Sequence, residues 1–106
     1  YCQTHHGLAL NHYWKDADKV EQLKKNYTEL NLSNEDLALC KYAQDVTLQP
    51  GKAESIDVTK PLKNVGFSDS VILDATLVVA YFNFVNRIVL SLGVGLEDDE
   101  GQGYKY

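Results

Sequence analysis

The chain has 106 residues, of which 44% are hydrophobic and 24% charged, and its formal net charge at pH 7 is −5. A single domain of this size buries roughly 60 to 70% of the surface that its unfolded chain exposes. Excess negative charge opposes binding to a phosphate backbone, so we expect no nucleic-acid partner. The two cysteines do not make a disulfide framework, which favours a cytoplasmic location.

Helices joined by short loops are predicted along the chain, because no alternation of period two is long enough to build a sheet. Residues 2–14 and 18–26 are predicted as the first two helices. A third helix is predicted to follow a cap at Ser33 or Asn34 and to run to about Leu48. The fold class is therefore all-α.

A short fourth helix is predicted from the position of Pro61. Proline is tolerated in the first turn of a helix but not in its interior, so the helix should begin near Thr59 or Lys60. Gly66 then provides the stop.

The last helix, residues 69–92, is predicted to be the dominant element, capped by Ser68 and closed by Gly93. It is apolar on more than one side, so it should be covered on several sides. Its longest apolar stretch, residues 75–85, falls short of the roughly 20 apolar residues of a membrane span. We therefore predict a buried helix and no membrane partner, with a preceding segment or a second subunit completing its cover.

Three polar residues interrupt this apolar helix: Asn83, Asn86 and Arg87. Buried amide and guanidinium groups need hydrogen-bond partners, so the first interpretation is a network that ties helices or subunits together. The alternative is that one of them lies near the pocket of Cys2.

Cys2 and His6 form the candidate reactive pair, because a spacing of four residues places both side chains on one face of a helix. A thiol in the first turn, beside a histidine, is where the thiolate is favoured. Tyr1 and His5 are candidates for a supporting role. Zinc binding is disfavoured, because no second cluster completes a set of four ligands.

Cys40, by contrast, is predicted to be a packing residue on a core face of the third helix, together with Leu37, Ala43 and Val46. The chain opens on Tyr1 and contains no Met, so we expect it to be a fragment whose preceding residues complete the site.

Two stretches resemble one family. The opening YCQTHHGLAL is similar to the end of the C-x-x-C-x-x-x-H motif of alkyl hydroperoxidase D-like proteins, in the carboxymuconolactone decarboxylase superfamily. The later GFSDSVILDATLVVAYFNFVNRIVLSLGVGLE resembles the long final helix of the peroxidase-related subgroup, with its FNFxNR segment and Leu-Gly turn. Cys2 falls on the second cysteine of the motif and His6 on its histidine.

The resemblance implies an all-α helical bundle over residues 1–95, lacking its N-terminal helices, and an acidic flexible tail over residues 96–106. It also implies a homo-oligomer that reduces a small hydroperoxide. Cys2 would be the peroxidatic thiol and His6 the relay base, with no bound cofactor or metal. An external dithiol, from a reductant protein or a small thiol, would regenerate Cys2. The first cysteine and a glutamate would precede Tyr1.

Two other functions remain open. The chain could be a non-catalytic or redox-sensing helical oligomerisation module, as its small size and apolar last helix allow. Decarboxylase-like lactone chemistry, which the superfamily includes, does not need the cysteine motif and is the minor alternative.

Overall fold

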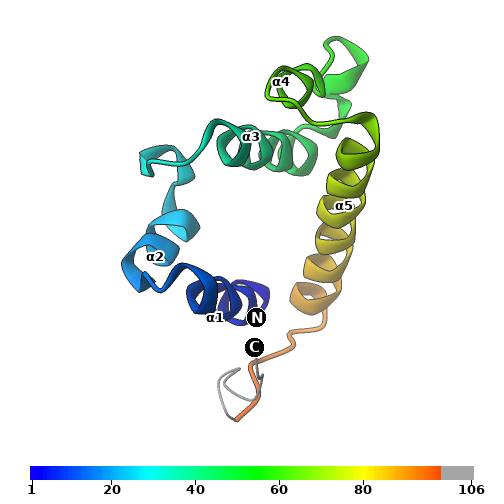
Figure 1. Cartoon of the computed structure of the whole chain (residues 1–106). Coiled ribbons are helices and arrows are strands. Elements are labelled where there is room, and N and C mark those ends of the chain that lie inside the picture. The colour runs from blue at the N-terminus through cyan, green and yellow to red at the C-terminus, as the bar shows by residue number, and fades with distance from the viewer. Residues whose placement is uncertain (99–106) are drawn as a thin grey trace. The chain divides into compact units, whose positions relative to one another are not determined.

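The computed structural model describes residues 1–98, and every regular element in that range is helical (Figure 1). The all-α class is therefore confirmed. The α-helices are α1 (Cys2–Trp14), α2 (Ala17–Lys25), α3 (Asn34–Leu48), α4 (Lys60–Asn64) and α5 (Asp69–Ser91), and two 3₁₀ turns are η1 (Tyr27–Glu29) and η2 (Pro50–Glu54).

Side-chain caps begin the two longest helices where the sequence predicts them. The hydroxyl of Ser33 accepts a hydrogen bond from the Asp36 amide at 3.1 Å, at the start of α3. At the start of α5, the hydroxyl of Ser68 accepts from the Val71 amide at 3.3 Å. Each hydroxyl satisfies a first-turn amide that has no partner within its helix. Both predicted caps are confirmed.

A glycine in the left-handed backbone conformation follows the end of α4, and another follows the end of α5. Gly66 has a φ of 98° and Gly93 a φ of 62°, so the two predicted stops take a conformation that glycine adopts without steric cost. Pro61 lies in the first turn of α4, also as predicted. The turns η1 and η2 were not predicted. They are too short to show an apolar period, and the Asn26 side chain, which accepts from the Thr28 amide, caps η1 locally.

The described residues divide into two compact units. One comprises Tyr1–Leu30 with residues 86–98, and the other comprises Asn31–Val85. Of the acidic tail predicted for residues 96–106, residues 99–106 lie outside the described part of the chain.

The core of the Asn31–Val85 unit consists of Tyr42, Leu62 and Ile72. Partly buried hydrophobic residues pack around it: Ala38, Leu39, Val46, Val58 and Phe67. The core face of α3 thus follows a spacing of four residues through Tyr42. Of the face predicted from Leu37, Cys40, Ala43 and Val46, Val46 packs against this core and Cys40 is half-buried, whereas Leu37 is 41% exposed.

The apolar helix α5 is largely exposed within the described chain. Ile72 is its one buried residue, and its large exposed side chains are Val71, Leu73, Leu77, Val78, Tyr81, Phe84, Ile88 and Leu90. Residues 1–98 thus do not cover α5 by themselves, and its burial by a preceding segment or a second subunit stays a prediction. By length and composition alone, α5 is also long and apolar enough to cross a membrane, which the shorter stretch 75–85 did not indicate.

Candidate thiol site at the start of the first helix

Cys2 is the first residue of α1, and its side chain is half-buried. Tyr1 occupies the N-cap position, but its phenol donates to Glu97 at 2.8 Å and does not cap the helix. The first turn carries no acidic side chain. The positive end of the helix dipole lies at Cys2, while the carboxylate of Glu97 is bound beside this turn by Tyr1 and His5.

His6 lies one turn after Cys2 in α1 and is exposed to solvent. The helix places the two side chains on a common face, as their spacing predicts. His6 is thus exposed on the same side of α1 as the thiol.

His5 makes the contacts that sequence reasoning missed. Its side chain is the buried polar one of the described core, with 7% exposure. Nδ1 lies 2.9 Å from the carbonyl oxygen of Tyr1, and Nε2 lies 3.0 Å from Oε2 of Glu97. The Tyr1 and His5 rings are also in contact, with centroids 4.3 Å apart.

The Glu97 carboxylate is held in its charged form. Its own backbone N–H and the Tyr1 phenol donate to it, and His5 adds a favourable charge and hydrogen bond, so its pKa lies below the usual value. The partner of Glu97 was not predicted, because His5 lies 92 residues away and residue 97 falls in the predicted tail.

Three polar residues of α5, Asn83, Asn86 and Arg87, were the remaining site candidates. The Asn83 amide donates to Thr47 Oγ1 at 3.0 Å and to the Val79 carbonyl at 3.1 Å, so it ties α5 to α3. This hydrogen bonding matches the interpretation in which the polar residues of α5 tie helices together. Asn86 and Arg87 are exposed, and a role for them near Cys2 stays a prediction.

A cavity of about 130 Å³ lies between α1 and α2, lined by Thr4, Gly7, Leu8, Asn11, Ala17, Val20, Glu21 and Lys24. At about 100° per residue, Thr4 points away from Cys2, so this cavity opens on the other side of α1. The side-chain oxygen of Asn11 is buried there without a hydrogen-bond partner. The cavity is not part of the thiol site.

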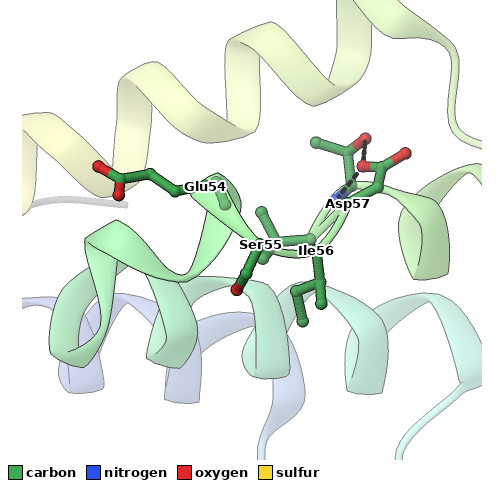
Figure 2. Close-up of a pocket in the computed structure, with 7 residues that line it drawn as sticks. Glu54, Ser55, Ile56 and Asp57 are labelled. Carbon is green, nitrogen blue, oxygen red and sulfur yellow. Dashed lines mark hydrogen bonds between the residues drawn. The ribbon is translucent and has the colours of Figure 1, made fainter.

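A more open pocket of about 410 Å³ is formed by residues 53–59 (Figure 2). Figure 2 shows Glu54 and Asp57 at opposite ends of this segment. Asp57 accepts from the Thr59 amide at 2.9 Å and from the Thr59 hydroxyl at 2.6 Å. These bonds form a turn, and the two acids do not act as a pair.

Metal binding has little support in the described part of the chain. Among residues 1–98, no group of three His, Cys, Asp or Glu side chains is arranged to hold an ion. Both ring nitrogens of His5 face Tyr1 and Glu97, so neither is directed toward a metal shared with Cys2 and His6.

No protein-family model matches this chain, and no curated protein matches its sequence significantly.

Proposed function

We propose that this chain is a thiol-dependent, peroxidase-like oxidoreductase in which Cys2 reduces a small hydroperoxide and His6 relays the proton. The observation that carries the proposal is the placement of Cys2. It is the first residue of α1, half-buried, with the solvent-exposed imidazole of His6 one turn later. The resemblance of the opening motif to alkyl hydroperoxidase D-like proteins supports the same chemistry.

The proposed reaction uses the thiolate of Cys2 as nucleophile. Its sulfur attacks the terminal oxygen of the hydroperoxide, the O–O bond breaks, and the alkoxide leaves with a proton from His6 as an alcohol. Cys2 is oxidised to sulfenic acid. One thiol of an external dithiol condenses with it, releasing water and forming a mixed disulfide. The second thiol then displaces Cys2, which returns as thiolate while the reductant becomes a disulfide.

The test follows hydroperoxide loss in the presence of dithiothreitol, comparing the wild type with Cys2→Ser and Cys40→Ser. We expect Cys2→Ser to abolish turnover and Cys40→Ser to retain it. Equal rates for the wild type and Cys2→Ser would contradict the proposed peroxidase function of Cys2.

The role of His6 is tested separately, with His12 as a matched control. His12 is also exposed on α1 but lies near its other end. General acid–base catalysis contributes about 100-fold or more, so His6→Gln should slow turnover by that factor while His12→Gln leaves it unchanged. Similar rates in both variants would remove His6 from the mechanism.

The exposed apolar side of α5 favours a second candidate, a non-catalytic helical module that assembles into a homo-oligomer. Sedimentation velocity of wild type and Leu77→Glu tests it. Assembly that is lost in Leu77→Glu, combined with no hydroperoxide turnover in the wild type, would favour this candidate. A wild type that stays monomeric would exclude it.

A further inference from the structure

The connection between α2 and α3 begins and ends with the same kind of sequence motif. It runs over residues 26–33, starting with NYT at residues 26–28 and finishing with NLS at residues 31–33. In each motif an asparagine is followed, two positions later, by a residue with a hydroxyl group, and the residue between them is not proline. This is the acceptor sequence for N-linked glycosylation, a modification of surface segments. The proposed thiol chemistry uses no residue of this connection.

The side chain of Asn26 is held in a turn by the threonine of its own motif. Asn26 is exposed and lies between the end of α2 and the start of η1. Its Oδ1 accepts a hydrogen bond from the Thr28 amide at 3.1 Å and another from the Thr28 hydroxyl at 2.6 Å. Bonds of this kind, from a residue two positions on to an asparagine oxygen, form an Asx turn. The hydroxyl that the motif requires is therefore in contact with the amide group that the modification would change.

The amide nitrogen of Asn26 can carry a sugar while these bonds are kept. Nδ2 donates to Oε1 of Glu29 at 3.3 Å. A primary amide has two N–H groups, and an N-glycosylated amide retains one of them together with its carbonyl oxygen. A glycan on Nδ2 thus leaves Oδ1 free to accept from Thr28 and leaves one N–H as a donor.

Asn31 is a second exposed asparagine, between η1 and α3. The hydroxyl of Ser33, two positions later, caps α3 by accepting from the Asp36 amide at 3.1 Å. Helix capping explains the presence of Ser33, but it assigns no role to Asn31. Within residues 1–98, the Asx turn of the first motif has no equivalent at Asn31, so Asn26 should be the better acceptor.

We propose that Asn26 is an acceptor site for an N-linked glycan and that Asn31 is a second, less occupied one. Nδ2 attacks the anomeric carbon of an oligosaccharide carried on a lipid pyrophosphate. The C–N bond forms, the bond from that carbon to the pyrophosphate oxygen breaks, and Nδ2 loses one proton. Such glycans are found on secreted proteins, so this modification stands against the cytoplasmic location that the cysteines favour. It does not depend on the proposed reaction of Cys2.

The first test uses the protein purified from its native source. Peptide N-glycosidase in ¹⁸O-water converts a glycosylated asparagine into ¹⁸O-labelled aspartate, which mass spectrometry locates. We expect more label at Asn26 than at Asn31. Asn34 is the matched control, because it is exposed but begins no acceptor motif, and it should stay unlabelled. A sample without the enzyme measures spontaneous deamidation.

Two results of this test would overturn the proposal. An unlabelled Asn26 and Asn31 would leave capping as the whole role of these motifs. Label at Asn31 alone would show that the Asx turn at Asn26 does not favour the modification.

The second test separates the motif from the asparagine itself. The full chain is secreted from a eukaryotic host behind a cleavable signal sequence, and the mass lost on glycosidase treatment is measured. Asn26→Gln and Thr28→Val should each lose one glycan, whereas Thr28→Ser, which keeps the motif, and Asn34→Gln should retain it. A wild type without a glycan, or a Thr28→Val protein that keeps the glycan on Asn26, would contradict the proposal.

Discussion

Glu97 Oε2 lies 3.0 Å from Nε2 of His5, although 92 residues separate them in the sequence. The contact brings a carboxylate from the end of the described chain to the first turn of α1. It makes His5, and not the exposed His6, the histidine that the fold holds in place.

The contribution of Glu97 to stability should depend on pH in one direction. Its folded pKa lies below the usual value of 4.5, so the stabilisation is present above about that pH and is lost as pH falls through the lowered pKa. Glu97→Gln should therefore lower the urea midpoint more at pH 7 than at pH 3. A midpoint difference that is the same at both pH values would mean that shape, and not charge, makes the contribution.

Leu62 should carry a large share of the stability of the Asn31–Val85 unit. Its side chain is 1% exposed in the core with Tyr42 and Ile72, so Leu62→Ala should cost about 2 to 5 kcal/mol. Leu48, at 68% exposure, is the matched control, and Leu48→Ala should change stability by no more than about 0.5 kcal/mol. Urea unfolding followed by circular dichroism measures both. Comparable losses would mean that the core lies elsewhere.

Cys40 should react slowly with iodoacetamide at pH 7. Burial raises the pKa of its thiol, and the nearby charge of Asp36 raises it further, so less thiolate is present. In Cys2→Ser protein, Asp36→Asn should increase the alkylation rate of Cys40, and Glu35→Gln should change it less. Mass spectrometry follows the reaction. A rate that is insensitive to Asp36→Asn would leave burial as the sole cause.

Gly7 should tolerate alanine, although the space is tight. A Cβ at this position would lie 2.7 Å from Cε of Lys24, which is near the free end of a flexible side chain and can move. Alanine favours a helix over glycine by about 1 kcal/mol, so Gly7→Ala should be neutral or stabilising. Adding Lys24→Ala should not change that result. A strongly destabilised Gly7→Ala would show that α2 itself cannot shift.

The helix bounds could be predicted because their signals are local. Ser33, Ser68 and Gly93 act within a few residues of themselves, and Pro61 restricts only its own turn. The common face of Cys2 and His6 likewise follows from one helix. Such features require no knowledge of what packs against them.

The remaining features depend on partners that are distant in the sequence. The core position of Tyr42 was not predicted, because the partner of its hydroxyl, Thr76 at 2.7 Å, is 34 residues away in the sequence. The His5–Glu97 contact could not be predicted, because nothing near residue 97 indicates where the chain turns. The exposure of α5 likewise depends on whether another segment or a second subunit packs against it.

The exposed apolar side of α5 also affects how the stability of this protein is to be measured. If a second copy covers α5, that surface is removed from water only in the assembled state, and folding is coupled to association. The unfolding midpoint then rises with protein concentration. A dilution series is therefore needed before any substitution in this chain is assigned a free energy.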